Sequence, residues 1–383
     1  MNRRELLGVA GALVSANVWS SRSAWAADEI VLGAAVPVTG PYSLSGRLYY
    51  DALHLAQDDI NAKGGIGGKK LKIAFEDTQS SNTGAVNAFI KLRQEYKPPL
   101  MFLSSYSTQN LATSPEVIKA GIPVFYAGGA EAVAEQHNKW MFRIRPDDGL
   151  VALGMADYVK NELKKSKPGV IFIQNDFGQG AANVVIDAFK KQGIEAAGAE
   201  GYGQNDKDMS AQILSLKAKG ADSLLLFCYP TDGALVAQQI KQLGLNIPLV
   251  GSSGLFLPTA INLLSARDFA NVWGVIDAVL DDSAGARVKD FMSRYQARFK
   301  READSYAACF YDAAMIAADG IAKVGADPDK LRDYIAGLRG YKGLAHEYSF
   351  DQLGNGVHSV SVVNMKPGKK EVALVKEVKP PRH

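Results

Sequence analysis

Short apolar runs alternate with helical patterns along most of the chain, and this alternation limits the possible folds more than any other feature. Ile30–Ala35 and Leu71–Phe75 are apolar runs of strand length. Tyr50–Asn61, which lies between them, and Ala85–Tyr96, which follows, repeat apolar residues at helical spacing. Strands that alternate with helices through short loops form parallel, doubly wound sheets with helices on both faces. The sequence therefore predicts an α/β fold.

The same alternation starts a second time after Met141–Arg145, a strand pattern that ends at Pro146. A chain of 383 residues is too long for one small core, and no low-complexity linker separates the two α/β units. We therefore expect two Rossmann-like lobes, each a mostly parallel sheet flanked by helices, joined by several crossings. Lobe 1 is expected to contain residues 27–146 plus about 280–348, and lobe 2 residues 147–279 plus about 349–383.

The same patterns place the other elements. The remaining expected strands are 100–103, 123–127, 170–174, 196–201, 223–228, 249–251, 272–278, 347–350, 360–364 and 372–378. The remaining expected helices are 110–119, 179–192, 209–219, 231–243, 286–300, 306–324 and 329–338. Pro37–Gly46 is rich in Gly, Pro and Ser and is predicted to be a loop.

Residues 1–26 have the features of an export signal. Arg3 and Arg4 precede an apolar run from Leu6 to Ala16, and Ala24-Trp25-Ala26 is a small-residue cleavage pattern. The apolar run is too short to cross a bilayer. We expect export with cleavage near Ala26, by the Sec route or by the Tat route, because Asn2–Leu7 resembles a twin-arginine signal.

Charge and cysteine usage exclude several classes of protein. The whole chain carries a net charge of +3, and the signal-like segment contributes three arginines and one glutamate, which leaves about +1. Such a balance gives no basic surface for nucleic acid. Cys228 and Cys309 are expected to be free and buried, and no Cys or His pair has the spacing of a zinc site.

A strand that ends in hydroxyl residues marks the candidate binding site. The apolar run Leu100–Leu103 leads into Ser104-Ser105-Tyr106-Ser107-Thr108, and a helical pattern follows from about Asn110. The unpaired N–H groups at a helix N-terminus attract anions, and Ser105, Ser107 and Thr108 would add O–H donors. The same residues are also ordinary N-caps, so both interpretations stay open at this point.

The other predicted strands end in similar residues. These ends carry Thr39-Gly40, Ser104-Ser105, Gly128-Gly129, Asn175-Asp176-Phe177, Tyr229 and Ser252-Ser253. Ligands of open parallel sheets bind outside the carboxyl ends of the strands. Hydroxyls, glycines and aromatic rings together fit a small polar ligand that has an apolar part.

No catalytic or nucleotide-binding motif is complete. Gly64–Lys70 lacks the spacing of a Walker loop and precedes a strand instead of following one. Gly178-Gln179-Gly180 opens a helix, but Asn183 stands where a dinucleotide fingerprint needs its third glycine. The five histidines are scattered. We therefore expect no enzymatic activity and no cofactor.

Several segments together resemble the leucine/isoleucine/valine-binding protein family, the type I periplasmic binding proteins of ABC importers. The segments are Pro37–Tyr42, Ala56–Leu71, Ser105–Gln109, Gly121–Val124, Phe142-Arg143, Asp176–Gly180 and Tyr348–Gly354. The resemblance covers nearly the whole mature chain. It implies a monomeric periplasmic protein whose two lobes close on a small molecule and deliver it to an ABC permease in the inner membrane.

The resemblance also implies roles for single residues. Ser105 would hold a ligand carboxylate, and the backbone carbonyl of Gly128 would accept from a ligand ammonium. Phe177 and Tyr229 would close over the ligand from the second lobe. The other residues expected to bind ligand are Tyr42, Ser45, Tyr106, Ser107, Thr108, Gly129, Ala130, Glu131 and Ser253.

Two positions depart from the pattern of the amino-acid binders. Ala130 replaces a threonine that contacts carboxylate and ammonium, and Ser253 replaces the acid that pairs with the ammonium. A buried ammonium without an acidic partner costs a few kcal/mol, and Glu131 is one possible substitute. We therefore expect a small carboxylate with an apolar or aromatic body. The alternatives are a branched-chain amino acid, an amide or urea, and a ligand-sensing role for a receptor.

Overall fold

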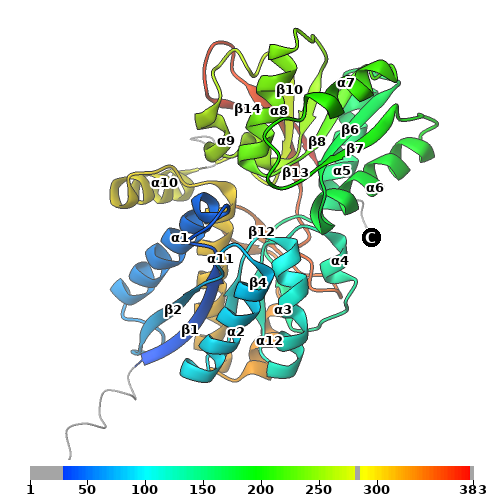
Figure 1. The fold of residues 1–383 in the computed structure, drawn as a ribbon. Helices are drawn as coiled ribbons and strands as arrows, with labels where there is room; N and C mark the ends of the chain where they lie inside the picture. Colours follow the sequence, from blue (N-terminus) through cyan, green and yellow to red (C-terminus); the bar gives the residue numbers. More distant parts are fainter. Residues whose placement is uncertain (1–28, 281–284, 380–383) are drawn as a thin grey trace, which may run out of the picture.

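The computed structural model of the protein describes residues 29–280 and 285–379. The expected export signal, residues 1–26, lies outside these ranges. The chain forms two α/β lobes (Figure 1). It passes from lobe 1 to lobe 2 after β5, returns after β10 and enters lobe 2 again after β12. The predicted fold class, two mostly parallel sheets flanked by helices and joined by several crossings, is therefore confirmed.

Lobe 1 is built on a parallel sheet with the strand order β2-β1-β3-β4-β5. Its strands are β1 (Glu29–Val36), β2 (Lys70–Asp77), β3 (Met101–Leu103), β4 (Val124–Tyr126) and β5 (Met141–Arg143). Its helices are α1 (Ser43–Ala62), α2 (Asn82–Tyr96), α3 (Ser107–Ala120), α4 (Glu131–Ala134), α10 (Ala286–Phe299), α11 (Ser305–Val324) and α12 (Pro328–Ala336). A short hairpin pairs β11 (Tyr341–Lys342) with β12 (Glu347–Tyr348).

Alternating side chains of β1 show how helices cover both faces of this sheet. Leu32, Ala34 and Val36 share one core cluster with α1 and α11. Ala35 belongs to a second cluster with α2 and α3. Successive side chains of a strand point to opposite faces, so a strand buried on both sides is apolar throughout. This explains the continuous apolar run that predicted β1.

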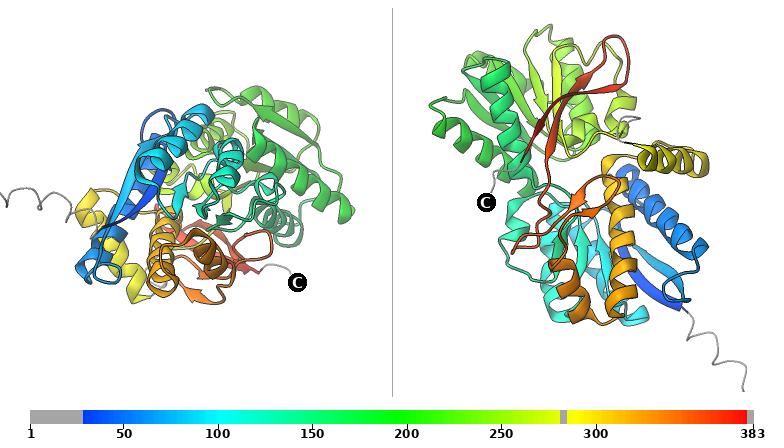
Figure 2. Two further views of the ribbon diagram at one scale, coloured as in Figure 1. Left: turned by 90° about the horizontal axis from the view of Figure 1, so that it is seen from below. Right: turned by 180° about the vertical axis from the view of Figure 1, so that it is seen from behind.

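Lobe 2 has a seven-stranded sheet with the order β14-β13-β10-β9-β8-β6-β7. Its strands are β6 (Pro168–Ile173), β7 (Gly198–Tyr202), β8 (Ser223–Phe227), β9 (Leu249–Gly251), β10 (Val272–Ile276), β13 (Val360–Met365) and β14 (Val372–Val378). Its helices are α5 (Asp148–Asp157), α6 (Asp176–Lys191), α7 (Ser210–Ala218), α8 (Pro230–Gln242) and α9 (Pro258–Leu263). The hairpin of β13 and β14 is antiparallel and extends the otherwise parallel sheet at its edge (Figure 2).

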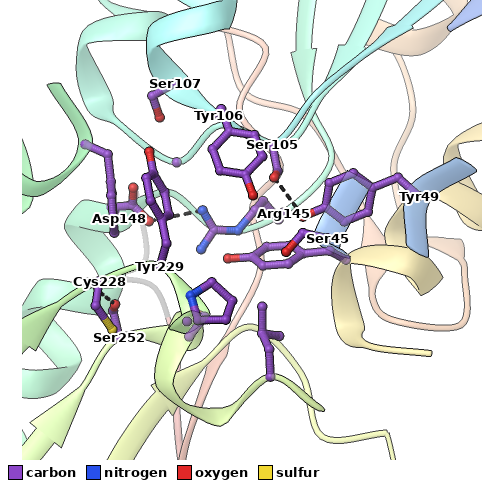
Figure 3. A pocket seen from close by; sticks show the side chains of 17 residues that line it. Ser45, Tyr49, Ser105, Tyr106, Ser107, Arg145, Asp148, Cys228, Tyr229 and Ser252 are labelled. Carbon is purple, nitrogen blue, oxygen red and sulfur yellow. Dashed lines mark hydrogen bonds and ion pairs between the residues drawn. The ribbon is translucent and has the colours of Figure 1, made fainter. Parts of the chain in front are cut away.

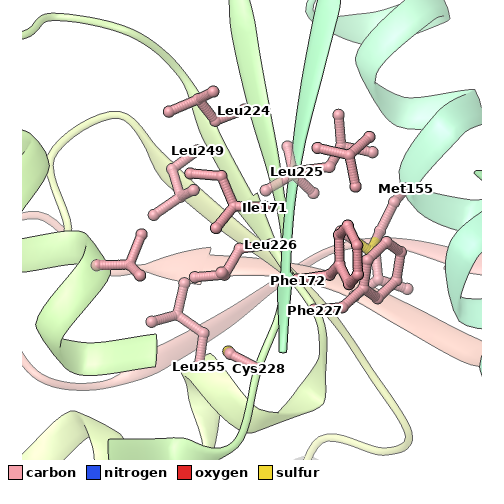
Figure 4. Packing of buried hydrophobic residues seen from close by; sticks show 14 of the residues in the cluster. Met155, Ile171, Phe172, Leu224, Leu225, Leu226, Phe227, Cys228, Leu249 and Leu255 are labelled. Carbon is pink, nitrogen blue, oxygen red and sulfur yellow. The ribbon is translucent and has the colours of Figure 1, made fainter. Parts of the chain in front are cut away.

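The core of lobe 2 repeats the pattern of β1. Leu224 and Leu226 of β8 point to one face of the sheet, whereas Leu225 and Phe227 point to the other, where Met155 of α5 lies (Figure 4).

No helix in the described ranges combines the length and apolarity that crossing a bilayer requires.

The helices α1, α2, α3 and α6 each begin at least three residues earlier than predicted, and the shifts of α1 and α3 bring polar residues to the predicted site. α1 begins at Ser43 instead of Tyr50, so the end of the predicted loop Pro37–Gly46 is helical. Gly46 makes this possible, because a Cβ at that position would lie 1.7 Å from the carbonyl oxygen of Pro37. α3 begins at Ser107 instead of Asn110.

The sequence patterns missed α4, α5 and α9. α5 is buried on nearly all sides, and such a helix has no polar face to produce a helical period. α4 and α9 are too short to show one. These omissions therefore follow from burial and length, not from unusual local conformations.

The segment that follows β12 is bonded to lobe 1 before it reaches lobe 2. The backbone N–H of Arg143 donates to Gly354 at 2.8 Å, and that of Gly356 donates to Arg143 at 3.0 Å, so this segment is bonded to β5. The chain joins the sheet of lobe 2 at Val360. The limits of the two lobes as independent units stay a prediction.

Two histidines stack at this crossing. The imidazole rings of His346 and His358 lie 4.2 Å apart, and the ring of Tyr348 meets both edge-on. Burial lowers the pKa of His346 to about 3 and lowers that of His358 as well. Arg145 lowers both values further, whereas the charge of Asp277 opposes the shift at His358. Both rings are therefore neutral at neutral pH.

We predict that this pair makes the protein less stable in mild acid. Below about pH 6.5 the histidines of the unfolded chain bind protons that those of the folded chain do not. For each histidine, the free energy of unfolding therefore falls by up to ~1.4 kcal/mol for each pH unit. Urea unfolding at several pH values should show a flatter dependence for the double variant H346F/H358F than for the wild type.

Two comparisons make this test specific. Burial raises the pKa values of Asp304 and Asp312 to about 7, so their contribution to the free energy of unfolding falls as pH rises toward 7. Both residues are present in both proteins, so this contribution cancels in the difference. The exposed His137 has a φ of 51°, which Asn tolerates, so H137N should behave like the wild type. Equal slopes for the wild type and the double variant would contradict the prediction.

Candidate functional site

The carboxyl ends of the two sheets face each other between the lobes, and a cavity lies there (Figure 3). The space in which the centre of a water molecule fits is about 40 Å³. Since a single water needs roughly 10–15 Å³ on this measure, the cavity has room for a few waters. Both lobes contribute to its walls, so its size depends on how far they are closed.

The strand order explains why these segments meet. In lobe 1, β1 is followed in the chain by β2 on one side of it in the sheet, whereas β3 is followed by β4 on the other side. In lobe 2, β6 is followed by β7 and β8 by β9, again on opposite sides. Such switch points open a crevice at the carboxyl ends of the strands. The predicted residues that line the cavity follow these strands or their neighbours; they are Ser45, Ser105, Tyr106, Ser107, Gly129, Phe177, Tyr229 and Ser253.

The start of α3 forms the hydroxyl-rich wall of the cavity. Ser105 Oγ lies 2.8 Å from the hydroxyl of Tyr49, and Ser107 Oγ accepts from the N–H of Ala130 at 3.1 Å. No side chain caps α3, and the N–H groups of Ser107 and Thr108 have no hydrogen-bond partner within the described part of the chain. The predicted anion-binding groups are therefore unpaired, although the Thr108 side chain does not line the cavity.

The turn after β4 approaches the cavity only through Gly129. The N–H of Gly128 donates to Asn110 Oδ1 at 3.1 Å, and a Cβ on Gly128 would lie 2.2 Å from that oxygen. The buried Arg143 holds the next two residues, because it donates to the carbonyl oxygens of Gly129 and Ala130. Gly128 and Ala130, both predicted to bind ligand, thus lie behind the cavity wall.

Aromatic rings from both lobes close one side of the site. Tyr42 does not line the cavity, but its ring stacks on Tyr106 at 3.7 Å between centroids. Tyr229 of lobe 2 meets Tyr106 edge-on at 5.0 Å (Figure 3). Phe177 stacks on Tyr229 at 5.4 Å. Because these contacts join the lobes, the structure represents a closed arrangement.

A buried ion network at the site was not predicted from the sequence. Arg145 donates from Nε and Nη2 to the two carboxylate oxygens of Asp277, at 2.6 and 2.9 Å, and from Nη1 to Asp148 at 3.0 Å. The guanidinium also lies 5.0 Å from the ring centre of Tyr306. All three charged side chains are at least nine-tenths buried.

A sequence signal for this network did exist. Arg145 closely follows β5, and Asp277 directly follows β10, so each places a charge where a buried strand ends. Charged residues are rarely buried unless they are paired, and a charge at that position indicates a partner nearby. Tyr49, Tyr306 and Leu257, which also line the cavity, gave no such signal.

Asp148 supplies the acidic group that the sequence seemed to lack. Its Oδ2 is buried and accepts no hydrogen bond within the described residues, and burial raises its pKa. Ser253, at the position expected for an acid, donates to Asp277 at 2.8 Å instead. Glu131 is exposed and lies against Gly149, outside the cavity wall. Asp148, and not Glu131, therefore lines the cavity.

The charges of the network do not balance. With both carboxyl groups ionised, one guanidinium of the network faces two carboxylates, and the charge of the buried Arg143, outside the network, offsets part of the excess negative charge at Asp148. A proton on Asp148 or a cationic group of a ligand would compensate the remainder. No group of three or more His, Cys, Asp or Glu side chains within residues 29–280 and 285–379 could hold a metal ion.

Comparison with known proteins identifies relatives over most of the chain. Residues 29–370 match the family model described as periplasmic binding protein. The Leu/Ile/Val-binding protein homolog 8 of Brucella abortus is 27% identical over 317 residues, which are 77% of this chain and 76% of the relative. An amino acid binding protein of Pseudomonas aeruginosa is 29% identical over 235 residues, 61% of this chain and 63% of the relative.

Solved structures share the fold. The leucine binding protein LivK of Thermotoga maritima superimposes with a TM-score of 0.84 at 22% identity and covers 92% of this chain and 99% of its own. LivJ of Streptococcus pneumoniae, solved with isoleucine, has a TM-score of 0.82 at 22% identity and covers 91% and 99%. At this identity the likeness establishes the fold alone.

We predict that Arg145→Met costs about 3–5 kcal/mol of unfolding free energy, because it leaves the buried carboxylates of Asp148 and Asp277 without their counter-charge. Lys219→Met is the matched control. It breaks the 2.6 Å pair with Glu200 at a half-exposed site and should cost less than about 1 kcal/mol. Urea unfolding measures both, and equal losses would show that the buried network contributes no more than a surface pair.

Proposed function

The chain belongs to the periplasmic binding protein family, and on this basis we propose that it is the periplasmic substrate-binding component of an ABC importer. It binds a small molecule between its lobes and presents the closed form to a permease in the inner membrane, acting as a monomer. The family binds substrates and does not transform them. The names of its relatives, Leu/Ile/Val-binding and amino acid binding protein, support an importer of the branched-chain amino acid type.

We further propose that the ligand is a small carboxylate with an apolar or aromatic body. The observation that carries this proposal is the unpaired start of α3, where Ser105 and Ser107 line the cavity and the N–H of Ser107 has no hydrogen-bond partner within the described residues. These donors and the helix dipole favour an anion. The rings of Tyr106, Phe177 and Tyr229 offer the body an aromatic surface.

Asp148 favours an α-amino acid among such carboxylates. Its unpartnered Oδ2 would accept from the ligand ammonium, which would also cancel the excess negative charge beside Arg145. A carboxylate without an ammonium would instead require Asp148 to be protonated. The absence of an acid at position 253 therefore no longer argues against an amino acid. No contact specifically favours an amide, a urea or a sensing role.

We predict that Ser105→Ala weakens ligand binding by roughly 1–3 kcal/mol, because the carboxylate loses a hydrogen bond. The apo protein should lose about 1 kcal/mol of stability as well, since the hydroxyl of Tyr49 loses its partner. Titration calorimetry on folded protein measures the affinity. Thr108→Ala is the control, because that side chain does not line the cavity. Unchanged affinity for Ser105→Ala would refute the placement of the carboxylate.

A thermal-shift screen of refolded mature protein tests the ligand class. The panel pairs each apolar or aromatic amino acid with the carboxylate that lacks only its ammonium, and it includes short amides. A bound ligand raises the melting temperature by mass action. We predict shifts with amino acids, and Asp148→Asn should abolish the preference for them over their deaminated partners.

Each other outcome has a clear meaning. Shifts only with deaminated acids would show that Asp148 is protonated in the complex and that the ligand carries no ammonium. Shifts only with amides would refute a carboxylate ligand.

A further inference from the structure

The small cavity adjoins a larger space between the lobes. Its volume of about 40 Å³ holds a few waters, which is less than a leucine-sized ligand occupies. A neighbouring cleft has about 700 Å³ on the same measure. Leu257 lines both spaces. If the ligand carboxylate lies at α3, the body of the ligand therefore has room only in the cleft.

The two spaces share walls on both sides of Leu257. In lobe 2, Gly254 lines the small cavity, whereas Phe256 and Pro258 line the cleft. In lobe 1, Tyr306 lines the small cavity, whereas Asp304, two residues earlier, lines the cleft. One loop and the start of one helix thus continue from one space into the other, and Leu257 is the side chain at their junction.

The cleft has both apolar and polar walls, and one of its polar groups is buried without a partner. Besides Asp304, its polar lining consists of Asn262, Glu302, Ser305, Lys366, Lys370 and Glu371. Phe256, Ile261 and Ile276 are buried in lobe 2, and Met292 of α10 lies across from them in lobe 1. Asp304 caps α11 by accepting from the N–H of Ala307 at 2.7 Å through Oδ1. Its Oδ2 is buried and has no hydrogen-bond partner within the described residues. A buried carboxyl oxygen without a donor is costly unless a ligand or a proton satisfies it.

We propose that the ligand site continues past Leu257 into this cleft, where the apolar body of the ligand lies and a distal hydrogen-bond donor on that body meets Asp304 Oδ2. This rests on the proposed function, because it assumes a carboxylate held at α3. It narrows the ligand class to carboxylates whose apolar body carries a hydroxyl or amine at its far end. Phenolic acids and amino acids of the tyrosine type meet this description, whereas leucine and phenylalanine lack the distal donor.

Two variants and three ligands test the proposal. The probes are L-leucine, L-phenylalanine and L-tyrosine, each beside its deaminated counterpart, and titration calorimetry measures their affinities. Asp304→Asn keeps the helix cap, because Asn is as good an N-cap as Asp, but it turns the free acceptor into an N–H donor. We expect it to weaken binding of the tyrosine-type probe about tenfold and to leave the phenylalanine-type probe within about twofold.

Leu257→Trp narrows the junction between the two spaces. It should weaken the two aromatic probes at least about tenfold more than leucine, which reaches less far into the cleft. Leu263→Trp adds the same ring at an exposed position of α9 and serves as the control, with no change expected. The melting temperature of each apo variant establishes that it is folded.

The outcomes separate this inference from the proposed function. If the wild type binds carboxylates but does not distinguish tyrosine-type from phenylalanine-type probes, or if Asp304→Asn weakens both alike, the extended site is refuted and the carboxylate site stands. If Leu257→Trp weakens all three probes equally, Leu257 belongs to the carboxylate site alone, which also refutes the extension. If no carboxylate binds while amides do, both proposals are refuted.

Discussion

The two-point contact between Arg145 and Asp277 is the interaction on which the arrangement of the lobes depends. Arg145 follows β5 where the chain first leaves lobe 1, and Asp277 follows β10 where it returns. Both side chains are nearly inaccessible to water, so each charge is tolerated only because the other is present. The planar guanidinium fixes the geometry of the contact and holds the first two crossings side by side.

The binding site follows from the same strand ends. Ligands of open parallel sheets bind outside the carboxyl ends of the strands, where short loops lead into the next helices. In lobe 1 the backbone N–H groups remain unpaired at the start of α3, whereas in the turn after β4 Arg143 and Asn110 occupy most of the backbone groups. The structure thus separates residues that support the site from residues that face it, although both follow strands.

The cavity and the neighbouring cleft divide the recognition of a ligand between two kinds of surface. Unpaired donors and Asp148 line the small cavity, which fits a charged head group. Apolar side chains from both lobes line part of the cleft, beside charged residues such as Lys370 and Glu371, and this apolar part fits a ligand body that gains from burial. Because the walls of both spaces come from both lobes, a ligand that fills them favours the closed form, which is how binding would be coupled to recognition by a permease.

Hydrophobic periodicity and helix-start chemistry are local, so the sequence predicted most of the strands and helices, the two-lobed fold and the strand end at Ser105. It could not identify α5, whose burial on nearly all sides erases the helical period, or decide that Gly128 and Glu131 lie outside the cavity wall. Only the tertiary structure paired Arg145 with Asp277, which are 132 positions apart, and left Asp148 and Asp304 each with an unpartnered oxygen. Whether a buried charge is paired depends on neighbours brought by folding from distant segments, and no local pattern records them.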